Sequence, residues 1–111
     1  MVRPTLRRYF RHGLFPQLLV FEAVVRLGGV TRAAVELHMA QPTVSTQLRK
    51  LSEALGVALI AWRGRELCLT AAGRELYAGC SDLLALFGGM EHRLAAHRPT
   101  APRTALQPAT A

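Results

Sequence analysis

The middle of the chain repeats its apolar residues with the period of an α-helix. The repeat runs at intervals of four, three and four residues, which places its members on one helical face. Its members are Val44, Leu48, Leu51 and Leu55. Because proline lacks an N–H, Pro42 fits only the first turn of a helix, and it fixes the helix start near Gln41. The pattern predicts a helix over 41–55.

A shorter helix is predicted immediately before it. Ala33, Ala34 and Leu37 follow helical spacing, and residues 38–40 form a tight turn between the two helices. The two alanines are small, so two steeply crossing helices can approach closely there. The segment 31–55 therefore predicts a helix-turn-helix.

The other face of the 41–55 helix is polar. A rotation of 100° per residue brings Pro42, Thr46, Arg49, Lys50 and Glu53 opposite the apolar stripe, with Thr43, Ser45 and Gln47 on the flanks. Near the helix start these side chains are small and form hydrogen bonds, a shape that can enter the roughly 12 Å major groove of DNA. The periodicity alone fits an ordinary amphipathic core helix with a solvated face equally well.

Further elements are predicted on either side of this pair. A first helix should begin near Pro16 and end at Gly28-Gly29, since glycine takes the left-handed backbone common at helix ends. Its inner face holds Leu18, Phe21 and Val24 or Val25. After residue 56, the apolar runs 59–61 and 67–69 flank Arg63-Gly64-Arg65, which predicts a two-stranded hairpin. Thr70 is a suitable N-cap for a following helix.

That last helix carries a heptad pattern. Apolar residues alternate at intervals of four and three, the pattern of two helices paired along their length. They are Leu76, Cys80, Leu83, Phe87, Met90 and Leu94. A helix folded back on its own domain is the alternative. Gly88-Gly89 weakens the helix, so we expect a break or kink near 88.

The amino-acid composition limits the classes of binding partner to consider. The 111 residues carry a formal net charge of +7, which suits a polyanion because released counterions drive phosphate binding. A ribosomal protein, a membrane-surface binder or a generic basic protein has the same charge. Residues 1–13 form a basic arm, which either lies along phosphate or is a solvated tail. Residues 98–111 are rich in Pro, Ala and Thr, and we expect them to be disordered.

The chain shows no enzyme signature. Cys68 and Cys80 have no metal-ligand spacing, the four histidines are scattered, and no glycine loop or paired carboxylates are present. We therefore expect no catalytic residues, no metal and no cofactor. The start of the chain lacks an apolar run of signal-peptide type, so we expect a cytoplasmic bacterial protein.

Several motifs together resemble one family. They are Leu18 with Phe21, Gly28, Ala33-Ala34 with Leu37, the run AQPTVS over 40–45 with Gln47, Leu48 and Leu51, Gly56 with Leu59, and Leu69-Thr70 with Ala72-Gly73. This set is similar to the amino-terminal DNA-binding domain of LysR-type bacterial transcriptional regulators, most of all the branch that controls carbon-fixation operons.

The resemblance implies a mainly α fold, a winged helix-turn-helix of three core helices and a two-stranded wing, followed by a long linker and dimerisation helix. The expected organisation is a basic arm over 1–13, a DNA-binding domain over 14–73, a linker helix over 74–97 and a tail over 98–111. The dimerisation residues would be the heptad set above. The expected assembly is a homodimer or a higher oligomer that forms through the linker helix.

The resemblance also implies sequence-specific binding of double-stranded DNA and transcription regulation. We expect Gln41, Thr43, Ser45 and Thr46 to meet base edges and Pro42 to contact a thymine methyl group. We expect Arg49, Lys50, Arg63 and Arg65 to serve phosphate or the minor groove. Thr31 and Arg32 complete the expected DNA-binding set.

The chain departs from the family pattern in several places. Gly29 stands where the family usually has serine, which leaves Thr31 as the candidate N-cap of the second helix. Ala40 has no side-chain acceptor, so the 41–55 helix should start uncapped, at a cost of about 1 kcal/mol relative to serine. Ile60 and Trp62 stand where the family commonly has Phe and Arg. Trp62 either packs under the wing or stacks on sugar-phosphate.

A LysR-type regulator normally continues into an effector-binding domain, which this sequence does not include. The chain is then either the excised DNA-binding half of a longer protein or, as the Pro/Ala tail favours, a natural short form, and no small-molecule site is assigned. An alternative function is an interaction module that forms heterodimers with a full-length regulator through the linker helix. A third is sequence-blind coating of nucleic acid.

Overall fold

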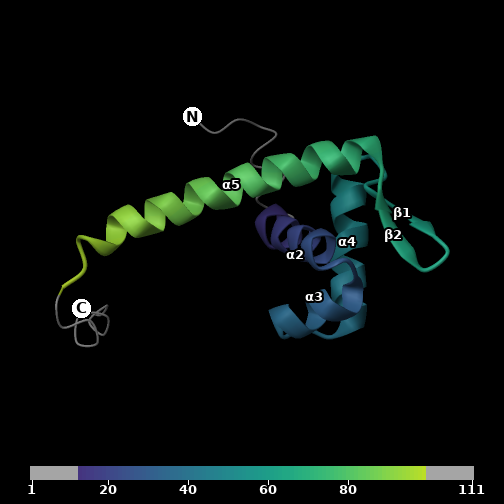
Figure 1. Cartoon of the computed structure of the whole chain (residues 1–111), viewed down its shortest axis with the longest axis horizontal. Coiled ribbons are helices and arrows are strands. Elements are labelled where there is room, and N and C mark those ends of the chain that lie inside the picture. Colours follow the sequence, from purple (N-terminus) through teal and green to yellow (C-terminus); the bar gives the residue numbers. More distant parts are fainter. Residues whose placement is uncertain (1–12, 100–111) are drawn as a thin grey trace. The chain divides into compact units, whose positions relative to one another are not determined.

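The computed structural model describes residues 13–99, so the basic arm before Gly13 and most of the tail lie outside the described residues. The elements follow in the order α2 (Leu14–Leu27), α3 (Val30–Leu37), α4 (Gln41–Leu55), β1 (Ile60–Arg63), β2 (Glu66–Leu69) and α5 (Ala71–Ala95), as labelled in Figure 1. The chain divides into two units, one ending at Ser81 and the other beginning at Asp82 within α5.

Three helices form the core of the first unit. Each of α2, α3 and α4 contacts the other two. From α4, Val44 and Leu51 are fully buried, and α2 contributes Phe21 and Val24. Ala33 and Ala34 are buried in the same core as Val44, which accounts for their small size. The predicted fold class, a winged helix-turn-helix with a long helix after it, is confirmed.

The helix ends use backbone bonds in place of side-chain caps. Gly28 has a φ of 80°, and the N–H of Gly29 donates to the carbonyl of Val24 at 3.0 Å, which closes α2. In the helix-turn-helix turn, His38 takes the left-handed conformation with a φ of 55°. Helix α4 begins at Gln41 without a side-chain cap from Ala40, as expected.

The prediction that Thr31 caps the second helix is wrong. Helix α3 begins at Val30 with Gly29 as its N-cap residue, and no side chain caps it. Thr31 therefore lies inside the first turn, two residues after the N-cap position. The turn between α2 and α3 is shorter than the sequence indicated because Gly28 and Gly29 complete it alone.

An ion-pair cluster that the sequence analysis missed joins α2 to α3. Arg26 donates to Glu22 at 2.9 Å and to Glu36 at 2.5 Å. The guanidinium of Arg26 lowers the pKa of Glu36 through its hydrogen bond, and the pKa of Arg26 is raised in turn. The pair is exposed, so it aligns the two helices more than it stabilises them.

The wing is an antiparallel pair with a two-residue turn at Gly64-Arg65. Ile60 pairs with Leu69 and Trp62 with Leu67. Gly64 has a φ of 67°, which glycine adopts without strain. Because alternate residues of a strand share a face, these four side chains lie on one face of the hairpin. Ile60, Leu67 and Leu69 pack against the helical core, so this is the inner face.

Thr70 fixes the base of the wing to the start of α5. Its Oγ1 accepts a hydrogen bond from the N–H of Gly73 at 2.9 Å and donates to the carbonyl of Ala58 at 2.7 Å. Its N–H donates to the carbonyl of Leu59 at 3.1 Å. The predicted N-cap is confirmed, and it also holds the segment that enters the wing.

Helix α5 runs unbroken through Gly79, Gly88 and Gly89, so of the break or kink predicted near 88 the break is wrong and the kink stays a prediction. A long helix can include these glycines at a cost of about 1 kcal/mol each relative to alanine. At its start, Leu76 and Cys80 pack into the core of the first unit with Phe21, Leu51 and Leu59. The alternative of a helix packed on its own domain therefore holds for these two residues of the heptad pattern.

Candidate nucleic-acid interface

The outer side of α4 is open where the sequence analysis placed DNA contacts. Gln41, Pro42, Thr43 and Ser45 are exposed, and Thr46 is half-buried. On the inner side, Val44 and Leu51 have no exposed surface. The buried stripe therefore fixes the helix to the domain and leaves the small polar side chains of its first two turns accessible.

Two cations follow on the same helix. Arg49 and Lys50 are both exposed. Nη1 of Arg49 lies 3.4 Å from Glu53, a loose surface pair that is worth little. No ion pair within residues 13–99 involves Lys50, the single lysine of the chain. Both cations can therefore meet phosphate without first breaking a strong bond.

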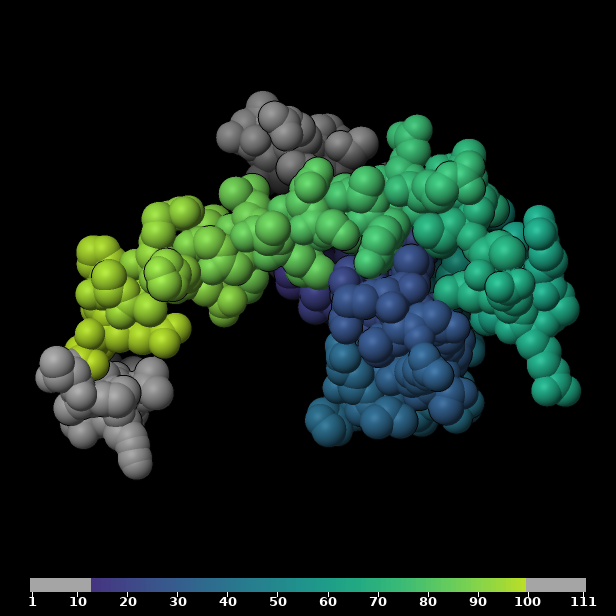
Figure 2. Space-filling view, in the orientation of Figure 1, coloured from purple at the N-terminus to yellow at the C-terminus, as the bar shows by residue number. Residues whose placement is uncertain are grey.

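The wing carries its arginines at the tip. Arg63 and Arg65 are exposed, and Figure 2 shows the hairpin standing out from the helices of the first unit. Arg63 pairs in register with Glu66, so one carboxylate accompanies this arginine. Arg65 lies in the turn itself, beyond the last strand pair.

The start of α3 and the wing border one hollow of about 470 Å³. Its lining comes from the α2–α3 turn and the first residues of α3, including Thr31 and Arg32, and from Trp62 and Arg65 of the wing. The fold thus brings together Thr31 and Arg32 with Trp62 and Arg65, which are up to 34 positions apart in sequence (31 to 65). Thr31 and Arg32 are exposed, on the side of the domain that also carries the wing.

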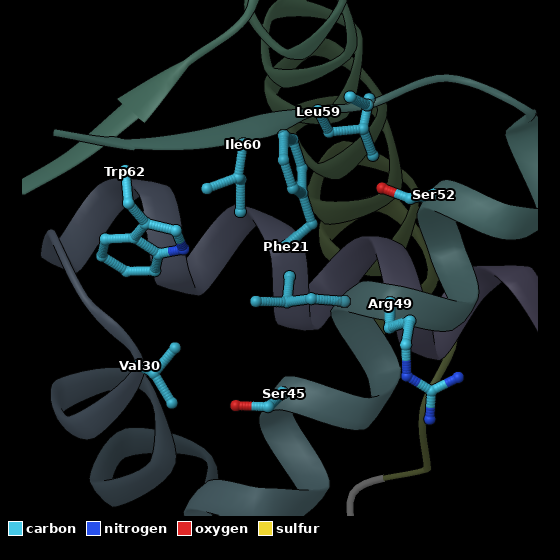
Figure 3. Close-up of a pocket in the computed structure, with 10 residues that line it drawn as sticks. Phe21, Val30, Ser45, Arg49, Ser52, Leu59, Ile60 and Trp62 are labelled. Carbon is cyan, nitrogen blue, oxygen red and sulfur yellow. The ribbon is translucent and has the colours of Figure 1, made fainter.

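A second cavity of about 340 Å³ separates β1 from α4 (Figure 3). Its apolar wall consists of Phe21, Val30, Leu48, Ala58, Leu59 and Ile60, and its polar rim consists of Ser45, Arg49 and Ser52. Trp62 borders both this cavity and the hollow next to α3. The side chain of Trp62 is 54% exposed, although it belongs to the inner face of the wing.

The sequence left two positions open for Trp62, one packed under the wing and one stacked on sugar-phosphate. Strand alternation was available as a signal, because Ile60 is apolar and two residues away, and it places both side chains on one face. What lies opposite that face depends on α4, which no local pattern specifies.

The predicted dimerisation residues differ in their exposure. Cys80 is buried in the core and the half-buried Leu76 packs against it, whereas Leu83, Phe87, Met90 and Leu94 of the second unit are between 39% and 63% exposed. Burial also raises the pKa of the Cys80 thiol, which keeps it protonated and unreactive. Cys68 is half-buried and, like Cys80, is not in a disulfide.

Residues 13–99 contain no group of three or more His, Cys, Asp or Glu side chains that could hold a metal ion. Among the same residues, no helix has the length and apolar character needed to cross a membrane.

Comparison with known proteins agrees with this geometry. Residues 15–74 match the family described as bacterial regulatory helix-turn-helix protein, lysR family. The chain is 48% identical to a RuBisCO operon transcriptional regulator of Allochromatium vinosum over 66 residues. These aligned residues are 60% of this chain and 22% of that protein. It is 45% identical over 74 residues to the protein of the same name in Acidithiobacillus ferrooxidans, covering 67% of this chain and 24% of that protein.

The fold is similar to a solved structure of a DNA complex. The crystal structure of the CbnR DNA-binding domain with DNA superposes with a TM-score of 0.67 at 36% identity, over 75% of this chain and 95% of that chain. The chain spans about a quarter of the length of the two curated relatives. The similarity therefore concerns their helix-turn-helix part.

Proposed function

The chain belongs to the LysR family of bacterial helix-turn-helix regulators, and from this premise we propose that it binds double-stranded DNA sequence-specifically to regulate transcription. One observation carries the proposal: the exposed side chains in the first two turns of α4 are polar except for Pro42, and a buried stripe on the opposite face fixes the helix to the domain. A protein with this role acts in the cytoplasm, on the nucleoid.

In this proposal α4 lies in the major groove. Gln41, Thr43, Ser45 and Thr46 meet base edges, where glutamine pairs with adenine and hydroxyls meet donors or acceptors. Pro42 contacts a thymine methyl group. Two or three such contacts at the helix start are enough to distinguish one base pair from another, because each good bidentate pair is worth about 1–3 kcal/mol.

The cations around α4 hold the sugar-phosphate backbone. Arg49 and Lys50 lie later on α4, where the groove wall runs, and Thr31 and Arg32 lie at the start of α3. Arg63 and Arg65 at the wing tip reach the neighbouring minor groove, whose negative potential attracts arginine. The net charge of +7 supports this part of the proposal.

We propose that two copies bind together. Leu83, Met90 and Leu94 of the second unit are exposed at heptad spacing, and a partner helix of the same kind would bury them. Two recognition helices would then read half-sites separated by whole turns of DNA. The same exposed residues would also serve the second candidate function, the formation of heterodimers with a full-length regulator.

A binding selection tests the proposal. The purified chain is incubated with a random duplex library, and with promoter DNA of a RuBisCO operon because two relatives carry that name. We expect one enriched, partly palindromic sequence that binds about 10³-fold or more tightly than random DNA. Random competitor that removes all binding would contradict sequence specificity. Binding that appears only after mixing with a related full-length regulator would favour the heterodimer function.

A further inference from the structure

Trp62 belongs to β1 of the wing and borders the cavity between the wing and α4. The proposed function places these two elements in different grooves of DNA. In a B-form duplex, one sugar-phosphate strand separates a major groove from the neighbouring minor groove. If α4 enters the former and the wing tip the latter, that strand has to pass between α4 and β1. The cavity of about 340 Å³ lies between these two elements.

The lining of this cavity suits a sugar-phosphate unit. Figure 3 shows the indole of Trp62 projecting from the wing, with its nitrogen on the ring edge that faces the cavity interior. Ser45 lies across from it on α4, and both residues are at the exposed rim. Leu48 and Ile60, both half-buried, form an apolar floor above the fully buried Phe21, and the carbon face of a deoxyribose can pack against it.

The indole N–H has no hydrogen-bond acceptor among residues 13–99. A tryptophan N–H only donates, and it usually finds a partner where the ring is partly buried. A phosphate oxygen is an acceptor of the right kind. The flat indole also offers an uncharged surface on which a sugar can stack.

We propose that this cavity receives one sugar-phosphate unit of the bound DNA strand, with the Trp62 ring against the deoxyribose and its Nε1–H donating to the phosphate. This inference rests on the proposed DNA binding and adds a contact of a different kind. Arg49, Lys50, Arg63 and Arg65 bind through charge, which salt screens. Trp62 contributes a term that salt leaves largely unchanged.

Fluorescence and affinity test this directly, because Trp62 is the single tryptophan of the chain. With the duplex enriched from the library, we expect the Trp62 emission to shift to shorter wavelength and change in intensity at saturation, since the strand removes water from the ring. Trp62→Ala should weaken binding about five- to twentyfold, toward the lower end of what aromatic stacking contributes. The slope of log K against log salt should stay the same.

A matched control moves the indole by one residue. Because alternate strand residues face opposite sides, Ala61→Trp combined with Trp62→Ala puts the ring on the outer face of the wing, and it should not restore affinity. A duplex with one neutral methylphosphonate linkage at the wing-side phosphate should bind the wild-type chain more weakly. The same linkage should cost Trp62→Phe less, because phenylalanine keeps a ring and lacks the N–H.

The outcomes separate the two proposals. No binding of the wild-type chain to any duplex would remove the proposed function and this inference together. Specific wild-type binding with unchanged Trp62 emission, or equal affinity of Trp62→Ala, would overturn the inference alone. Rescue by the relocated indole would overturn it as well. Thermal unfolding of each variant identifies any loss that comes from misfolding.

Discussion

At Gly73 the first turn of α5 packs directly on the backbone of Leu59. A methyl group built at this position would overlap the carbonyl oxygen of Leu59, and the side chain of Leu69 lies 3.1 Å away. The same carbonyl accepts the N–H of Thr70. Glycine is therefore required here for close approach, which explains why the LTxAG motif ends in it. The motif was visible in the sequence, whereas its cause lies fourteen residues earlier in the chain.

Substitution of this residue gives a sharp test of the packing. Gly73→Ala should lower the free energy of unfolding by about 1–3 kcal/mol, because backbone has to move to admit the methyl group. Urea denaturation followed by circular dichroism measures it. Gly79→Ala is the matched control in the same helix: nothing lies within 4 Å of its added carbon, so it should stabilise the chain by up to about 1 kcal/mol. Equal effects of both substitutions would show that the contact with Leu59 is absent.

Among the elements, α4 carries different kinds of side chain at its start and in its third turn. Its first two turns carry hydroxyl and amide groups, and its third turn carries Arg49 and Lys50. Hydrogen bonds to bases depend on sequence, and contacts with phosphate do not. Substitutions at the two ends of this one helix should therefore change different quantities.

Two substitutions, Gln41→Ala and Lys50→Ala, compare base discrimination at the start of α4 with phosphate binding in its third turn. Gln41→Ala should reduce discrimination at one base pair by about 1–3 kcal/mol and leave the salt slope unchanged. Lys50→Ala should weaken binding to all duplexes about equally and lower the salt slope by about 1. Fluorescence anisotropy with single-base variants of the selected duplex, at several salt concentrations, measures both.

Arg93→Ala removes the same charge from the last turn of α5 and serves as the control for net charge. If its salt slope falls as much as that of Lys50→Ala, Lys50 makes no local phosphate contact. An unchanged base preference in Gln41→Ala would likewise remove Gln41 from the set that meets base edges.

The Arg26 cluster couples two elements through charge, and pH tests it. Because Arg26 lowers the pKa of Glu36 in the folded chain, this pair stabilises the fold above the ordinary pKa of glutamate, about 4.3. The contribution is lost as pH falls through the lowered pKa. Glu36→Gln should therefore make the unfolding free energy fall less steeply as the pH drops below the ordinary pKa of glutamate. Arg26→Gln should have the same effect, and an unchanged curve for Glu36→Gln would contradict the coupling.

At the scale of the whole molecule, the chain combines two units that use their apolar residues differently. The first unit buries its own, including Leu76 and Cys80, around Phe21 and Leu51. The second exposes Leu83, Met90 and Leu94. A stripe of exposed apolar residues at heptad spacing is stabilised when it pairs with another. Self-association is thus a property expected of the second unit.

Disruption of this stripe should give a monomer. Met90→Glu combined with Leu94→Glu keeps helix-forming residues but places charge on the stripe, so the dimer should dissociate at micromolar concentration. Sedimentation equilibrium measures the mass. Ala85→Glu adds charge at an exposed position outside the heptad pattern, and it should leave the mass unchanged. A wild-type chain that sediments as a monomer throughout would exclude pairing through α5.

The sequence by itself determined the elements of this protein. Periods of 3.6 and 2 residues, the proline of α4 and the glycines at turns are local signals, and they placed the three helices and the wing correctly. They also placed the open face of α4, because a buried stripe specifies the face opposite to it.

Only the tertiary structure decided which distant residues meet. In the folded chain Cys80 is buried in the core and Leu76 packs against it, and α5 continues through Gly88-Gly89 without a break. Thr31 does not cap α3, and Trp62 lies across a cavity from Ser45. The physical reason is the same in each case. A local pattern states which side of an element is apolar, but the neighbour that covers this side is chosen by the packing of all elements together.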